Sequence, residues 1–152
     1  MTFNHIMLVV SDMEKALSLW RDLLGFQIVF DSPCPDGVMI DKITQDTCYG
    51  VEGVNTHLVL LTSQEGAVIE LQQPFVPECK VTPREFLDYS YTGLNELALT
   101  VTDIEKWFEK VRAAGYETTT DFIWKFGNLT KSFIFRDQDY NLIQLCENIP
   151  QE

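Results

Sequence analysis

Three side chains in apolar stretches of this sequence have the chemistry needed for binding or proton transfer. His5 and Glu96 occupy the same place in two copies of one sequence string, and Glu70 lies between Ile69 and Leu71. Histidine changes charge near neutral pH and is a frequent metal ligand. A carboxylate in an apolar strand must be paired, hydrated or bound to a metal ion, because burying it alone is costly. These residues therefore predict a binding site or an acid–base site.

The repeated string organises the whole chain. It runs from Asn4 to Lys15 and returns from Asn95 to Lys106, with Asn, Leu, Val, Asp, Glu and Lys identical at matched positions. A repeat of this length is too long for a solenoid unit and fits a half-domain that was duplicated and fused. The pair that changes chemistry between the copies is His5 and Glu96.

Each copy predicts a strand, a helix and a second strand. The run 6–10 is short, apolar and β-branched, which is typical of a buried strand. The Ser-x-x-Glu string at 11–14 and the Thr-x-x-Glu string at 102–105 fit a capping box at a helix start. Gly25 and Gly115 then end the two helices, because glycine tolerates the left-handed C-terminal position.

The remaining apolar runs complete a βαβββ pattern in each half. Further strands are expected at 26–30, 55–62, 67–72, 94–100, 116–122, 130–136 and 142–147, and helices at 13–24 and 103–114. The loop 63–66 makes a hairpin of its two neighbours. If Thr62 pairs with Ala67, His57 and Glu70 share one face of that hairpin, whereas a slip of one residue separates them. His57 is thus a candidate acid–base group or substrate contact, with an exposed strand residue as the alternative.

An insertion at 38–54 separates the second and third strands. Met39, Ile40 and Ile43 predict a short helix there, after a break at Pro33 and Pro35 and a turn at Asp36-Gly37. Both a lid over a pocket and a surface flap fit this stretch.

Composition limits the class of protein and its partners. The chain has 152 residues, 23 acidic against 11 basic side chains, and a net charge of −12. This charge disfavours nucleic acid and anionic membranes as partners. The chain has no membrane-length apolar run and no secretory signal pattern, which predicts a cytoplasmic protein. Four cysteines without CxxC spacing are expected to be reduced thiols.

Nearly the whole chain resembles the vicinal oxygen chelate superfamily, which includes glyoxalase I, methylmalonyl-CoA epimerase, extradiol dioxygenases and bleomycin-resistance proteins. The strings that carry the resemblance are Asn4–Ile6, Leu24–Phe26, Val68–Leu71, Gly93–Glu96 and Arg136–Leu145. The resemblance implies an α+β fold, in which two tandem βαβββ modules form a cup-shaped mixed sheet. It implies a single glyoxalase-like domain over 1–152, with module one at 1–73, a linker at 74–92 and module two at 93–152.

The resemblance also implies a divalent metal ion (Zn, Ni, Co, Mn or Fe) held by the first and last strands of each module. By position its ligands are His5, Glu70, Glu96 and Gln144. Metal-binding members usually have His at the place of Glu96 and Glu at the place of Gln144, so the metal affinity is expected to be lower here. An extradiol dioxygenase needs a two-His-one-carboxylate triad, of which only His5 is present.

The resemblance favours a metal-dependent lyase, isomerase or epimerase that acts on a small carbonyl-containing metabolite. Glu70 or Glu96 would remove the proton as general base, and His57 is a further catalytic candidate. The alternative is a metal-free protein that sequesters an aromatic drug or metabolite, as bleomycin-resistance proteins do. A third is metal-free acid–base catalysis by His5, His57 and Glu70. The resemblance also implies a homodimer, and Phe133 and Phe135 are expected to line the cup.

Overall fold

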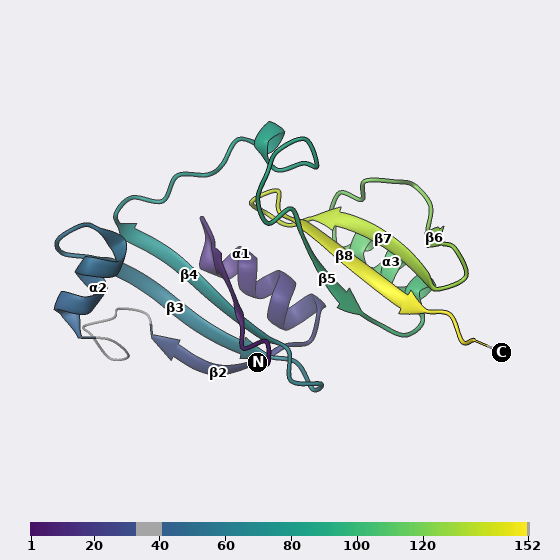
Figure 1. The fold of residues 1–152 in the computed structure, drawn as a ribbon, viewed down its shortest axis with the longest axis horizontal. Coiled ribbons are helices and arrows are strands. Elements are labelled where there is room, and N and C mark those ends of the chain that lie inside the picture. Colours follow the sequence, from purple (N-terminus) through teal and green to yellow (C-terminus); the bar gives the residue numbers. More distant parts are fainter. Residues whose placement is uncertain (33–40, 152) are drawn as a thin grey trace. The chain divides into compact units, whose positions relative to one another are not determined.

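The structure is a computed structural model that describes residues 1–32 and 41–151. Its contacts divide the chain into two compact units, which we call unit one (Met1–Val81) and unit two (Thr82–Glu152). Each unit contains one four-stranded mixed sheet with helices packed beside it, as Figure 1 shows. The α+β class and the two tandem βαβββ modules are confirmed.

Unit one is built on a sheet of order β1-β4-β3-β2. Its elements are β1 (Ile6–Val9), α1 (Met13–Leu17), η1 (Ser18–Leu23), β2 (Gln27–Ser32), α2 (Lys42–Tyr49), β3 (Asn55–Thr62) and β4 (Val68–Val76). β1 runs parallel to β4, and the other neighbours are antiparallel. The first and last strands of the module therefore lie side by side, because α1 and η1 carry the chain from β1 to β2 at the far edge of the sheet, and β3 and β4 lead it back.

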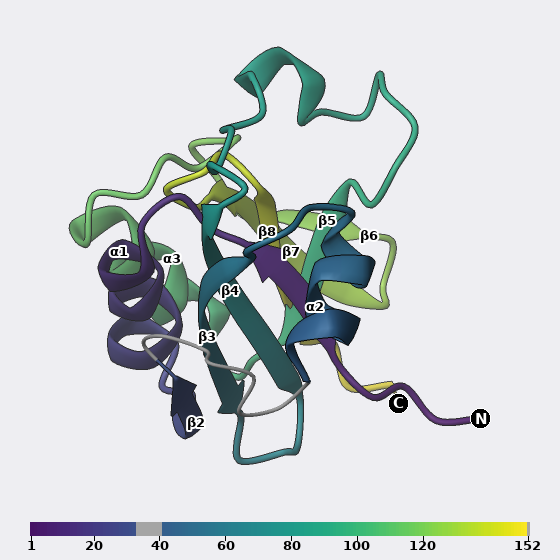
Figure 2. The same cartoon turned by 90° about the vertical axis from the view of Figure 1, so that its left-hand side faces the viewer.

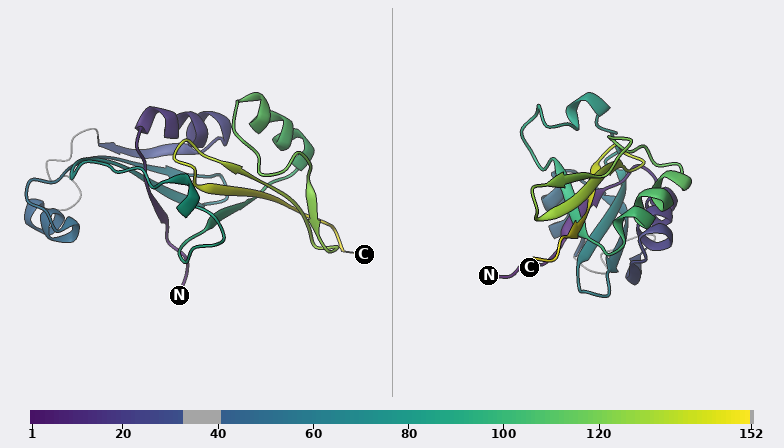
Figure 3. Two further views of the ribbon diagram at one scale, coloured as in Figure 1. Left: turned by 90° about the horizontal axis from the view of Figure 1, so that it is seen from above. Right: turned by 90° about the vertical axis from the view of Figure 1, so that its right-hand side faces the viewer.

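The core of unit one lies between this sheet and the α1–η1 helix. Alternate residues in the middle of β3 and at the start of β4 are buried there, namely Val59, Leu61, Ile69 and Leu71. Trp20, from the π-helical turn η1, is fully buried and packs edge-on against Phe26 with ring centroids 5.5 Å apart. The opposite face of the same sheet carries α2, as the views in Figures 2 and 3 agree.

Unit two repeats this plan with the sheet order β5-β8-β7-β6. Its elements are η2 (Arg84–Phe86), β5 (Glu96–Thr100), α3 (Ile104–Ala113), β6 (Trp124–Phe126), β7 (Thr130–Arg136) and β8 (Leu142–Asn148). α3 covers one face of the sheet, where Phe108 meets Phe133 edge-on at 5.1 Å. β5 runs parallel to β8, in the same relation as β1 to β4.

Several expected local features differ from the structure. α1 is capped by Asp12 rather than Ser11, because the Asp12 carboxylate accepts a hydrogen bond from the Lys15 amide at 3.2 Å. Asp103 occupies the corresponding cap position of α3, with a left-handed backbone (φ 58°) and no side-chain cap bond. Both helices therefore have their N-cap one residue after the predicted Ser11 and Thr102.

The strand expected at 116–122 is also wrong. That segment touches β7 only through irregular contacts, including a single bridge between Thr118 and Phe135, and the regular edge strand is β6. In the insertion the helix is α2, which begins at Lys42. The predictions on Pro33, Pro35, Asp36-Gly37, Met39 and Ile40 lie outside the described residues, as does Cys34.

Two further predictions concern the cysteines and membrane-spanning segments. Cys48, Cys79 and Cys146 form no disulfide with one another. In the described ranges, no helix is both long and apolar enough to cross a membrane.

Candidate functional site

The β1–β4 pairing brings two of the predicted residues together in unit one. Met7 lies opposite Glu70 in the parallel register, and His5 precedes Met7 by two residues on the same face. His5 Nε2 is 3.4 Å from Glu70 Oε2. The His5 side chain is 40% exposed and the Glu70 side chain 17%, so the pair is partly sheltered and still reachable from solvent.

The neighbouring Asn4 fixes the orientation of the His5 ring. His5 Nδ1 is 2.6 Å from Asn4 Oδ1. An amide oxygen only accepts hydrogen bonds, so Nδ1 must carry the proton and donate it. In the neutral ring, Nε2 then presents a lone pair toward the Glu70 carboxylate. Both Nε2 and Oε2 can bind a cation with their lone pairs.

The other oxygen of Glu70 is occupied by a neighbouring amide. Gln72 Nε2 donates to Glu70 Oε1 at 2.5 Å, and the Tyr49 hydroxyl donates to Gln72 Oε1. Burial and the charge of Glu70 both raise the pKa of Tyr49, which keeps its phenol protonated as a donor. The four side chains form one line of contacts: His5, Glu70, Gln72 and Tyr49.

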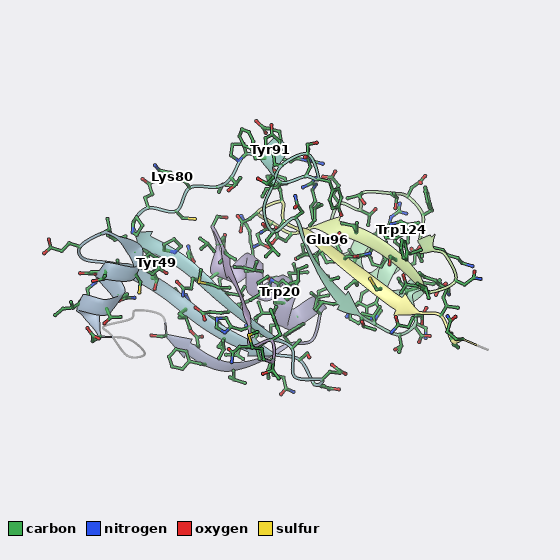
Figure 4. The ribbon with its side chains drawn as sticks, in the orientation of Figure 1. Trp20, Tyr49, Lys80, Tyr91, Glu96 and Trp124 are labelled. Atoms are coloured by element: carbon green, nitrogen blue, oxygen red, sulfur yellow. The ribbon has the colours of Figure 1, made fainter. Side chains whose placement is uncertain are left out.

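Tyr49 is the last residue of α2, and its side chain reaches Gln72 on β4 (Figure 4). Asp46 anchors the helix, because its carboxylate accepts hydrogen bonds from the amides of Gly53 and Val54, each at 3.0 Å, and from Lys42 Nζ at 2.7 Å. The Lys42 bond and then the backbone bonds lower the pKa of Asp46 to about 2. The insertion is thus tied to the start of β3 by a permanently charged side chain.

Apolar side chains surround the Glu70 carboxylate on its face of the sheet. Met7 and Val9 point to this face from β1 and are 47% and 48% exposed. Leu58 and Leu60 point to it from β3, as the partners of Gln72 and Glu70. A charged pair beside half-exposed apolar side chains suits a small ligand that has both oxygen atoms and an apolar part.

His57 does not belong to this group. Thr62 pairs with Val68 rather than with Ala67, so Leu60 lies opposite Glu70 and His57 opposite Gln73. The predicted register is therefore wrong by one residue, and His57 lies on the face opposite to Glu70. There its Nε2 contacts Asp31 Oδ1 at 2.7 Å.

Unit two presents Glu96 and Gln144 in the equivalent register. Ala98 pairs with Gln144 as Met7 pairs with Glu70, and Glu96 precedes Ala98 by two residues at the start of β5 (Figure 4). Glu96 Oε2 accepts a hydrogen bond from the Tyr89 hydroxyl at 2.5 Å. Partial desolvation and then this bond raise the pKa of Tyr89 to about 12. Glu96 is thus engaged by a phenol, where His5 is engaged by a carboxylate.

The aromatic residues expected to line the cup lie elsewhere. Phe133 and Phe135 are fully buried on the α3 side of the sheet, where Phe133 meets Phe108 and Phe135 meets Tyr116. Their predicted position is wrong. The register of β6 with β7 instead directs Trp124 and Phe126 to the face that carries Gln144.

The distance between the two donor atoms of unit one, His5 Nε2 and Glu70 Oε2, fits a divalent ion. Ligand atoms bonded at about 2.1 Å to one ion lie roughly 3.0–3.4 Å apart in octahedral or tetrahedral geometry. The 3.4 Å between His5 Nε2 and Glu70 Oε2 lies at the upper end of this range. The Asn4 bond to Nδ1 is the kind of outer contact that orients metal-bound histidines. Within the described residues, however, no three His, Cys, Asp or Glu side chains gather closely enough to hold an ion by themselves.

Sequence reasoning missed Gln72, Tyr49 and Tyr89. Gln72 follows Glu70 by one strand period, so the alternation of β4 already placed it on the same face. Tyr49 and Tyr89 come from the insertion and from the segment before β5, and no pattern in the sequence indicates which side chains they reach.

Comparison with known proteins identifies the family. The model of the Glyoxalase/Bleomycin resistance protein/Dioxygenase superfamily matches residues 2–145. A comparison with curated proteins finds no match.

Solved structures show the same fold at low sequence identity. A glyoxalase family protein from Bacillus cereus is 16% identical, with a TM-score of 0.82 over 97% of this chain and 94% of that one. A mutant of the fosfomycin resistance protein FosX from Listeria monocytogenes, complexed with Mn(II) and 1S,2S-dihydroxypropylphosphonic acid, is 16% identical, with a TM-score of 0.65 over 99% and 93%. A glyoxalase family protein from Enterococcus faecalis is 20% identical, with a TM-score of 0.65 over 96% and 97%. The family model, which matches most of the chain, shows that the chain belongs to the Glyoxalase/Bleomycin resistance protein/Dioxygenase superfamily.

Proposed function

We propose that this protein is a divalent-cation-dependent lyase, isomerase or epimerase that moves a proton on a small carbonyl compound. The observation that carries the proposal is the approach of His5 Nε2 to Glu70 Oε2 at 3.4 Å, with Nδ1 already engaged by Asn4. With Nδ1 engaged, Nε2 is the ring nitrogen that would bind a divalent ion together with Glu70 Oε2. The Mn(II) in the listerial FosX complex supports such an ion on this fold.

His5 and Glu70 are the residues that would hold the cation, and Glu96 and Gln144 stay predictions as further ligands. A divalent ion there acts as a Lewis acid on a carbonyl oxygen. Glu70 and Glu96 both stay predictions as the general base, and Tyr89, which donates to Glu96, would orient that carboxylate. His57 has no part in the proposal, because it lies on the other face of its sheet.

The metal content of the purified protein tests this proposal. We expect wild-type protein prepared without chelator to bind about one divalent ion per chain, and Mn²⁺ titration to give saturable binding. The Glu70→Ala substitution should lower the affinity for Mn²⁺ by about 100-fold or more, since it removes one of the two well-placed ligands.

The matched control is Glu65→Ala, which removes an exposed glutamate from the turn between β3 and β4. This variant should bind Mn²⁺ as the wild type does. Wild-type protein that stays metal-free and ignores added Mn²⁺, Ni²⁺, Co²⁺ and Zn²⁺ would contradict the cation-dependent function.

A second candidate function is metal-free binding of an aromatic drug or metabolite. It is favoured by the half-exposed Met7 and Val9 beside Glu70, together with the lack of a three-residue ligand group in the described parts of the chain. Here a cationic group of the ligand would take the place of the metal ion at Glu70. Metal-free protein that binds aromatic cations, and loses them in Glu70→Ala, would favour this second function over the first.

A further inference from the structure

We infer that Gln72 and Tyr49 are positioning residues that fix which oxygen of Glu70 faces His5. This inference rests on the proposed function, because it concerns how Glu70 is presented to a cation. Gln72 donates to Glu70 Oε1 at 2.5 Å, while Oε2 lies 3.4 Å from His5 Nε2. The carboxylate is therefore divided between an amide on one side and the imidazole on the other.

The Glu70 carboxylate sets the direction of this arrangement, because it only accepts hydrogen bonds and Gln72 must therefore present its NH₂ group to it. This leaves Gln72 Oε1 to accept the proton of the Tyr49 hydroxyl. Tyr49 thus holds the far end of the amide and fixes its position beside Glu70. The raised pKa of Tyr49 keeps the hydroxyl protonated across the physiological range.

The position of Tyr49 depends in turn on α2. Asp41 caps the start of this helix through the Thr44 amide at 3.0 Å, and Asp46 ties it to Gly53 and Val54. The insertion therefore brings Tyr49, the last residue of α2, to the Glu70 face of the sheet. A lid and a surface flap were the alternatives for the insertion. The Tyr49 contact gives it a role in holding Gln72 beside Glu70.

If a cation binds beside His5, we expect Glu70 to hold it through Oε2. The hydrogen bond from Gln72 occupies Oε1 and holds the carboxylate plane, so Oε2 is the oxygen that faces His5. A divalent cation there would supply Lewis-acid chemistry to a substrate oxygen.

Mn²⁺ binding by three glutamine and tyrosine variants tests the inference. Gln72→Leu should weaken Mn²⁺ binding by about 10- to 100-fold, the range for lost outer-shell contacts. Tyr49→Phe should give a smaller loss of up to about 10-fold, because it frees the amide to turn without removing it. Gln73→Leu is the matched control. Gln73 is the next glutamine along β4 and lies on the other face, where it bonds Met13 N and Ser11 O. It should lower the thermal stability and leave the Mn²⁺ affinity unchanged.

The ¹⁵N resonances of the His5 ring give a second readout without metal. Gln72→Leu should shift the Nε2 resonance, since Glu70 is then free to reorient, and Gln73→Leu should not. Wild-type protein that binds no Mn²⁺ overturns the proposed function, and in that case the His5 resonances decide on the positioning role. Wild-type Mn²⁺ binding that persists unchanged in Gln72→Leu, or a His5 ring that does not sense the substitution, overturns the inference alone.

Discussion

Units one and two pair their first and last strands in the same register but place different chemistry on it. In unit one the matched positions are His5 and Glu70, whose side chains meet at 3.4 Å. In unit two they are Glu96 and Gln144, and Glu96 bonds to Tyr89 instead. Duplication therefore preserved the backbone frame, while the side chains at these positions diverged. Superfamily membership alone thus gives the position of a site and not its ligands.

The segments outside the repeat enlarge this difference. Unit one has α2 between β2 and β3, and α2 supplies Tyr49 to the Glu70 face. In unit two the corresponding strands β6 and β7 are joined by the short turn 127–129. The residue that engages Glu96 comes instead from the segment before β5. Each unit thus recruits a tyrosine, but from a different part of the chain.

The helical cores give the largest expected contrast between the units. Trp20 is fully buried against Phe26, whereas Trp107 on α3 is only half-buried, with Lys110 Nζ 4.4 Å from its ring centroid. Trp20→Ala should lower the free energy of unfolding by about 3–5 kcal/mol, because it leaves a large cavity. Trp107→Ala should cost less than about 1 kcal/mol, near the value of an exposed cation–π contact. Urea denaturation monitored by circular dichroism measures both, and equal losses would contradict the assigned packing.

The two equivalent positions His5 and Glu96 should differ in their effect on cation binding. His5→Ala should weaken Mn²⁺ binding by about 100-fold, since the imidazole faces Glu70 with its ring held by Asn4. Glu96→Ala should weaken it by less, because the Tyr89 hydroxyl already engages that carboxylate. Calorimetric titration of both variants makes the comparison. Equal losses would show that unit two contributes as much to the ion as unit one.

Local patterns predicted the elements of this fold better than their contacts. The strand at 55–62 was predicted with its observed bounds, because its apolar residues alternate and turn residues flank it. The predicted register of the hairpin that β3 forms with β4 is wrong by one residue, since Thr62 pairs with Val68. In the observed register, His57 lies on the face of the sheet opposite to Glu70. The observed loop is 63–67, one residue longer than expected, and loop length and turn type set the register of a hairpin.

The site itself was predictable only where the repeat fixed a position. The repeat places His5 and Glu96 in equivalent strands, and the matching apolar strings do the same for Glu70 and Gln144. Tyr49 reaches Gln72 from a separate helix, and this contact depends on how α2 docks. Phe133 and Phe135 were assigned to the wrong face because α3 covers the side of β7 that they occupy. Tertiary packing, which local patterns do not encode, decides both cases.

The anchor of α2, which has no counterpart in the turn 127–129 of unit two, gives the smallest expected effect. The pKa of Asp46 is lowered to about 2, so its contribution to stability is present above about pH 4, the usual range of an aspartate, and is lost as the pH falls through 2. We expect the amide resonances of Gly53 and Val54 to shift with a midpoint near pH 2 in wild-type protein. Asp46→Asn should abolish that transition and speed hydrogen exchange in α2. The NH₂ group of asparagine replaces one of the two oxygens that accept the Gly53 and Val54 amides. Asp22→Asn, an exposed change beside Arg21, should leave these amides unchanged. A midpoint near pH 4 in the wild type would mean that the hydrogen bonds to Asp46 do not hold α2. Tyr49 would then not be fixed by them.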